Sequence, residues 1–70
     1  SPLITQELFA ALHRLNVEEG LSILLVEQNA NLAVKIASQV YLLETGAIVG
    51  AGTAEEISRD DSIRRAYLGY

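Results

Sequence analysis

The spacing of apolar residues changes along the chain and separates helical from extended segments. Residues 4–19 carry apolar side chains at helical spacing, on Ile4, Leu8, Ala11, Leu12 and Leu15. This spacing predicts a helix with one apolar face. Thr5 is its predicted N-cap, and Gly20 is the predicted left-handed residue that ends it.

A run with almost no polar residue follows the first helix. Residues 21–27, LSILLVE, are typical of a strand buried on both faces of a parallel sheet. Residues 30–38 show a second helical stripe, and residues 40–44, VYLLE, predict another strand. A helix that connects two strands indicates a crossover unit with a parallel pair.

Turn and cap residues mark the last third of the chain. Thr45-Gly46 predicts a tight turn, after which residues 47–49 return as an antiparallel strand. Thr53 and Glu56, in TAEE, form a capping box that begins a short helix ending near Ser58.

The last predicted helix covers residues 62–68, with Asp60 or Asp61 as its cap. The predicted order is therefore α-β-α-β-β-α-α, an α/β fold. A strand as apolar as residues 21–27 needs neighbouring strands on both edges and helices on both faces. We therefore expect a fragment of a wider sheet, with self-association or strand exchange at its unpaired edges.

Composition narrows the classes of protein. The 70 residues make at most one small domain; half are hydrophobic, and there is no cysteine for a disulfide or a thiolate zinc site. The net charge is −4 and the five basic residues are scattered, which disfavours nucleic-acid binding. The longest apolar run, residues 23–26, is far shorter than the roughly 20 residues that cross a bilayer. Ser1-Pro2 resembles a cut inside a longer sequence.

Candidate chemistry gathers at the end of the predicted strand 21–27. Gln28 is placed where open α/β sheets bind ligands. Its amide can donate to a phosphate oxygen but cannot act as a general base; a hydrogen bond to local backbone is the alternative. Asn29 is the predicted N-cap of the next helix, and we expect Glu27 to be exposed or paired. His13 is the only histidine, and we expect it on the surface.

The sequence contains neither GxxxxGK[ST] nor GxGxxG, so no phosphate cradle is encoded here. No serine has a neighbouring base that would activate it. Taken alone, the residues make no complete active site.

The motifs LLVEQNA, LETG and AYLG, with their spacing, resemble the end of an ATP-binding subunit of ABC importers, the branched-chain amino acid type above all. The resemblance covers essentially the whole chain, so residues 1–70 are expected to be the C-terminal part of an ABC ATPase domain, a fragment of a P-loop NTPase-like sheet. It implies that Gln28 occupies the switch position, usually histidine, and faces the γ-phosphate of ATP. Walker A, the signature and Walker B are expected to precede Ser1.

The resemblance also implies cofactors, partners and a location. The parent protein is a transport ATPase that uses ATP and Mg, whereas the isolated chain is expected to bind neither and to be inactive. Its partners are the missing N-terminal part of the domain, a second ATPase subunit and membrane permease subunits. The parent lies peripherally on the cytoplasmic side of a bacterial inner membrane.

Two alternative hypotheses assign the chain to other classes of protein. An independent small α/β module that binds a ligand or a partner is expected to unfold cooperatively as a monomer. A structural interaction domain would instead add a strand at the edge of its sheet.

Overall fold

The first helix begins earlier than predicted. In the computed structural model, which describes residues 1–69, α1 covers Pro2–Glu19 with Ser1 as N-cap. Thr5 lies inside the helix and donates its N–H to the carbonyl oxygen of Ser1 at 3.0 Å, so its prediction as N-cap is wrong. Proline has a φ suited to the first helical position and needs no N–H there, which favours the earlier start. Gly20 ends the helix at φ 70°, as predicted.

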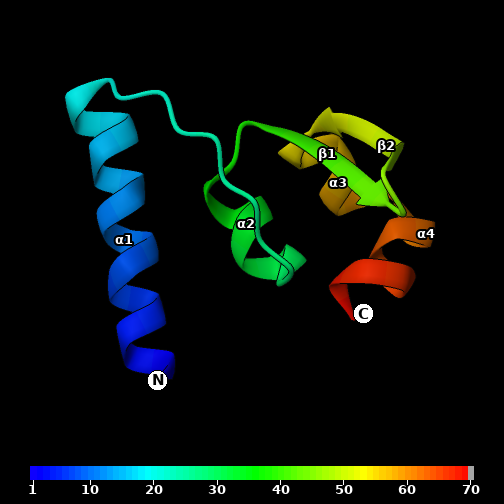
Figure 1. The fold of residues 1–70 in the computed structure, drawn as a ribbon, viewed down its shortest axis with the longest axis horizontal. Helices are drawn as coiled ribbons and strands as arrows, with labels where there is room; N and C mark the ends of the chain where they lie inside the picture. Colours follow the sequence, from blue (N-terminus) through cyan, green and yellow to red (C-terminus); the bar gives the residue numbers. More distant parts are fainter. Residues whose placement is uncertain (70) are drawn as a thin grey trace.

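The predicted apolar face of α1 is covered only in part, since Ala11 and Leu12 are half-buried and its other residues are exposed. Phe9 is the buried residue of the helix, at 7% exposure, whereas Ile4 and Leu8 are 66% and 55% exposed. Of the other elements, α1 approaches α2, which lies beside its middle (Figure 1). The predicted apolar stripe therefore has little within residues 1–69 to pack against.

Residues 21–27 do not form the predicted strand. They connect α1 to α2 without regular structure, and the predicted parallel pair is absent from residues 1–69 (Figure 1). Leu24 and Val26 are 93% and 92% exposed. A strand is stabilised by ladder hydrogen bonds to a neighbour. The two strands of the structure pair with each other, and neither extends its hydrogen-bond ladder to residues 21–27.

The hairpin is the only sheet in the described residues, and it is longer than predicted. Strands β1, Gln39–Glu44, and β2, Ala47–Thr53, pair antiparallel. The turn between them has positive φ at both positions, 49° at Thr45 and 77° at Gly46, as a two-residue hairpin loop requires. A register shift lies between Leu42 and Leu43.

Large residues of β1 face glycines of β2. Val40 pairs with Gly52 and Leu42 with Gly50. A Cβ atom at Gly50 would lie 3.1 Å from Cδ1 of Leu42, so the leucine occupies the space that a side chain at position 50 would need.

Short capped helices follow the hairpin. Helix α3, Ala54–Arg59, begins with the predicted capping box, and α4, Asp61–Ile63, is capped by Asp60. The chain then widens into a π-helix, η1, Arg64–Leu68, where a continuous α-helix was predicted. Ile57 and Leu68, at 4% and 2% exposure, are buried here.

Helix α2, Ala30–Ile36, lies between α1 and the group formed by the hairpin, α3, α4 and η1 (Figure 1). The observed order is α1-α2-β1-β2-α3-α4-η1, a small α/β arrangement without the first predicted strand. None of the helices described in residues 1–69 has the length and hydropathy needed to cross a membrane.

Candidate functional site

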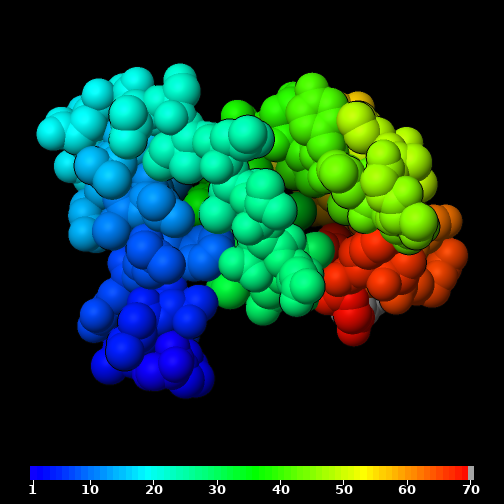
Figure 2. Space-filling model, viewed as in Figure 1, coloured from blue at the N-terminus to red at the C-terminus, as the bar shows by residue number. Residues whose placement is uncertain are grey.

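Gln28 lies on a bend between the extended segment and α2. Its residue is exposed, and α2 begins at Ala30. Figure 2 shows the segment that leads to it on the surface, between α1 and the hairpin. The strand expected before Gln28 is absent, but the predicted helix after it is present, so the bend is positioned mainly by α2.

Both neighbours of Gln28 bond to backbone groups nearby. The Glu27 carboxylate accepts a hydrogen bond from the N–H of Asn29 at 3.0 Å. The side-chain oxygen of Asn29 accepts from the N–H of Leu32 at 3.3 Å, which confirms Asn29 as the N-cap. These bonds stabilise the first turn of α2 by satisfying donors that lack a partner within the helix.

The side-chain amide of Gln28 is the polar group of this turn that is available to a ligand. No side-chain hydrogen bond to Gln28 is present among residues 1–69, whereas the side chains on either side of it are engaged. A carboxamide offers two donor hydrogens and one acceptor oxygen without a charge. It can therefore contact a phosphate oxygen or a water molecule, but its proton chemistry is weak near neutral pH.

An apolar hollow of about 720 Å³ lies next to the bend. It is lined by residues of α1, by residues 23–28, by α2 and β1, and by Ile57 and Leu68 among others. Such a lining is that of a protein interior, because most of its residues are aliphatic.

The described residues do not by themselves fit Mg²⁺ or the phosphates of ATP. In residues 1–69 no group of three or more His, Cys, Asp or Glu side chains could hold a metal ion. His13 is exposed on α1, as expected. Gln28 thus supplies a single polar contact, and the other ligands of a nucleotide would have to come from other residues.

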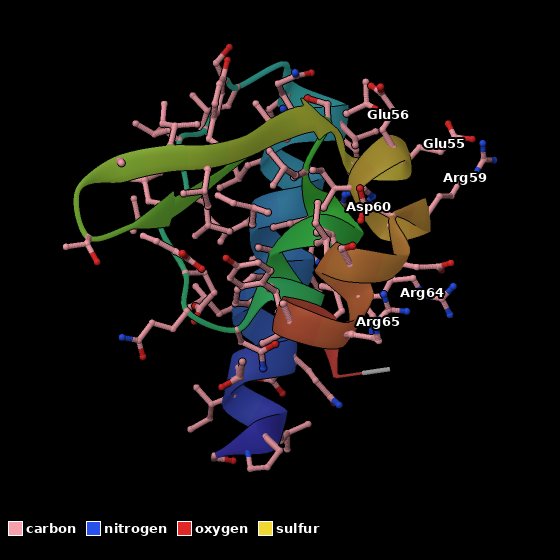
Figure 3. All side chains as sticks on the ribbon, turned by 90° about the vertical axis from the view of Figure 1, so that its right-hand side faces the viewer. Glu55, Glu56, Arg59, Asp60, Arg64 and Arg65 are labelled. Atoms are coloured by element: carbon pink, nitrogen blue, oxygen red, sulfur yellow. The ribbon has the colours of Figure 1, made fainter. Side chains whose placement is uncertain are left out.

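The charged groups labelled in Figure 3 lie on α3, on η1 and at Asp60, which precedes α4. Arg59 pairs with Glu55 at 2.5 Å and Arg64 with Asp61 at 3.5 Å. Exposed pairs of this kind contribute about 0–1 kcal/mol each. They neutralise one another locally and form no basic surface near Gln28.

Two groups away from the bend have shifted pKa values. The backbone N–H of Thr53, and then its hydroxyl, lower the pKa of Glu56 by hydrogen bonding to its carboxylate form. A hydrogen bond to the Glu44 carboxylate raises the pKa of Tyr67, because the neutral phenol is the donor.

Asn31 was not singled out by sequence reasoning. Its side-chain nitrogen donates to the carbonyl oxygen of Leu68 at 2.6 Å, across 37 positions of the sequence. No spacing or motif relates these two positions, so only the folded chain reveals the contact.

Comparison with known proteins finds relatives that match nearly the whole chain. No family model matches it. The high-affinity branched-chain amino acid transport ATP-binding protein BraG of Pseudomonas aeruginosa is 42% identical over 69 residues, which are 99% of this chain and 29% of BraG. LivG of Salmonella typhimurium, a protein of the same description, is 33% identical over 69 residues, 99% of this chain and 27% of LivG. This chain is related to the ATP-binding subunits of ABC transporters.

The ABC family resemblance carried by LLVEQNA, LETG and AYLG is therefore confirmed. The lipopolysaccharide export system ATP-binding protein LptB of Haemophilus influenzae is also similar, at 30% identity over 50 residues, 71% of this chain and 21% of LptB. The chain spans less than a third of the length of each of these relatives. The switch role of Gln28 stays a prediction.

Proposed function

We propose that the chain is the C-terminal part of the ATP-binding subunit of an ABC importer for branched-chain amino acids. The observation that carries this proposal is the 42% identity to BraG over 99% of the chain. The bare apolar surface supports it: Leu24 and Val26 are almost fully exposed, and a wider sheet would cover them.

Within that subunit, Gln28 occupies the switch position and contacts the γ-phosphate of ATP. Its support is the exposed amide between two side chains that bond to the backbone of α2. The contact is a hydrogen bond without charge, so Gln28 senses the phosphate and orients water near it. It does not remove a proton.

The rest of the subunit binds ATP and Mg, whose chemistry is phosphoryl transfer to water. Without it the 70-residue chain is inactive, because it encodes no phosphate loop. The remaining partners are a second ATPase subunit and permease subunits, and the assembly lies on the cytoplasmic side of a bacterial inner membrane.

The test is ATP turnover by the full-length subunit with and without the Gln28 amide. Gln28→Ala should lower the turnover number at saturating ATP by about 10²-fold, which is typical of losing one oriented donor in a reaction site. Gln6→Ala is the matched control: it removes an exposed glutamine from α1 and should leave turnover unchanged. Equal turnover in wild type and Gln28→Ala would contradict the proposed role.

The isolated chain gives a second test. It should show no ATP turnover, and its hydrodynamic size should exceed that of a monomer because copies cover one another's apolar surface. An independent module would instead be a monomer with a closed core. In residues 1–69 the buried apolar residues are Phe9, Ile57 and Leu68.

A further inference from the structure

The hydrogen bond from Asn31 to Leu68 connects the helix after Gln28 to the end of the chain. Asn31 is the second residue of α2, and its side-chain nitrogen lies 2.6 Å from the Leu68 carbonyl oxygen. Asn31 is half-buried and Leu68 is 2% exposed, so the bond is partly shielded from water. Shielding makes a lost partner costly, because a buried carbonyl would then lack a donor.

The end of η1 needs such a donor. The last carbonyl groups of a helix have no N–H partner within the helix. Gly69, at φ 81°, donates its N–H to Arg64 and closes the π-helix, which leaves the Leu68 carbonyl to accept from elsewhere. Asn31 supplies the hydrogen from α2.

Hydrogen bonds, together with the first turn of α2, link η1 to the residues on either side of Gln28. Asn31 and Leu32 belong to the first turn of α2, and the N–H of Leu32 donates to the Asn29 side chain. The N–H of Asn29 donates to the Glu27 carboxylate, so the residues on both sides of Gln28 are bonded to this turn or to each other. The direction of the Gln28 amide therefore follows the orientation of the first turn, which Asn31 joins to η1.

We propose that Asn31 is a positioning residue for Gln28 and that η1 is the support it uses. The proposal rests on the proposed function of Gln28 and adds a requirement to it: the AYLG end of the chain must be docked on α2 for full ATP turnover. A π-helix at this place is consistent with such a role, since single π turns are frequent at functional sites.

A double-mutant cycle in the full-length subunit tests the proposal. Asn31→Ala should lower turnover about tenfold at saturating ATP, since small displacements of an oriented group reduce rates strongly. In the Gln28→Ala background the same substitution should cause no further loss, because it acts through that amide. Asn31→Asp keeps the size, removes the donor and suits the start of a helix, so it should behave like Asn31→Ala while keeping α2 folded.

The control is another asparagine with the same chemistry. Asn16 donates to the Leu21 carbonyl at 2.9 Å on the exposed end of α1, and Asn16→Asp should leave turnover unchanged. Equal fold losses from Asn31→Ala in both backgrounds, or full turnover by Asn31→Asp, would overturn the positioning role while Gln28 keeps its own. Full turnover by Gln28→Ala would instead remove the proposed function, and this inference with it.

Discussion

The two parts of the chain on either side of Gln28 differ in how far their apolar side chains are buried and in how their helix ends are hydrogen-bonded. In residues 29–69 the helices α2, α3 and α4 each have a side-chain N-cap, which α1 lacks, and Asn31 and Tyr67 add long-range hydrogen bonds. In residues 1–28 a long helix is followed by a segment with two almost fully exposed aliphatic side chains. Residues 29–69 are stabilised largely by contacts among themselves. Residues 1–28 leave apolar side chains without such contacts.

The exposed segment marks where this chain lacks a packing partner. A fully buried aliphatic side chain stabilises a fold by about 1.5–3 kcal/mol relative to an exposed one, so exposed Leu24 and Val26 forgo that stabilisation. The exposure of these two side chains favours a covering surface supplied by the rest of the proposed ATP-binding subunit.

The largest expected effect separates the two parts directly. In the isolated chain, Ile57→Ala should lower the free energy of unfolding by about 2–5 kcal/mol, because Ile57 is 4% exposed. At concentrations where the chain is monomeric, Leu24→Ala should change it by less than about 0.5 kcal/mol, because Leu24 is 93% exposed in a single copy. Urea denaturation of both variants measures the difference.

The same Leu24 substitution sharpens the comparison in the full-length subunit. If the segment is a covered strand there, Leu24→Ala should cost more than about 2 kcal/mol. A cost near zero in both the isolated chain and the subunit would mean that no neighbour covers Leu24.

A middle-sized effect is expected at the helix starts. Thr53→Ala removes the cap of α3 and should lower the free energy of unfolding by about 1 kcal/mol. Thr5→Ala is its matched control, since Thr5 lies within α1 and caps nothing. The melting temperature should therefore fall only for Thr53→Ala. An equal fall for Thr5→Ala would mean that Thr5 does cap the helix.

A smaller effect is expected where η1 meets the hairpin. Tyr67→Phe removes the hydroxyl that donates to Glu44 and should lower the melting temperature slightly near neutral pH. The raised pKa of Tyr67 means that this stabilisation is present below the ordinary tyrosine value of 10.0 and is lost as pH rises through the folded pKa. The melting temperatures of Tyr67→Phe and wild type should therefore converge at high pH; a constant gap would contradict the bond.

The smallest effect is a dependence on acid at Glu56. Its pKa is lowered from 4.5, so its charged form stabilises the fold above that value and the stabilisation is lost as pH falls through the folded pKa. Glu56→Gln should be less stable than wild type at neutral pH and equal to it in acid. Urea midpoints measured from neutral pH down to about pH 3 test this, because the unfolded carboxyl titrates in that range.

Local signals in the sequence predicted local structure well. The capping box at Thr53, the cap at Asn29 and the turn at Thr45 were all confirmed. Each is satisfied by residues within a few positions, so the neighbouring sequence is sufficient to specify it.

Features that need distant partners were predicted less well. The strand at residues 21–27 has the right composition, but a strand requires a neighbour that residues 1–69 do not place beside it. The apolar stripe of α1 was recognised, yet the most buried residue of the helix is Phe9, which the stripe did not include; α2 packs beside this helix. The bond between Asn31 and Leu68 could not be foreseen, since hydrogen-bond partners 37 positions apart share no pattern.

The pairing of Leu42 with Gly50 has a consequence for how this hairpin can vary between species. Gly50 has no positive φ, so its backbone would accept any residue, and the leucine opposite it is what restricts the position. Homologues with alanine or a larger residue at position 50 should carry a smaller side chain at position 42. The residues at positions 42 and 50 should therefore covary across an alignment of homologues.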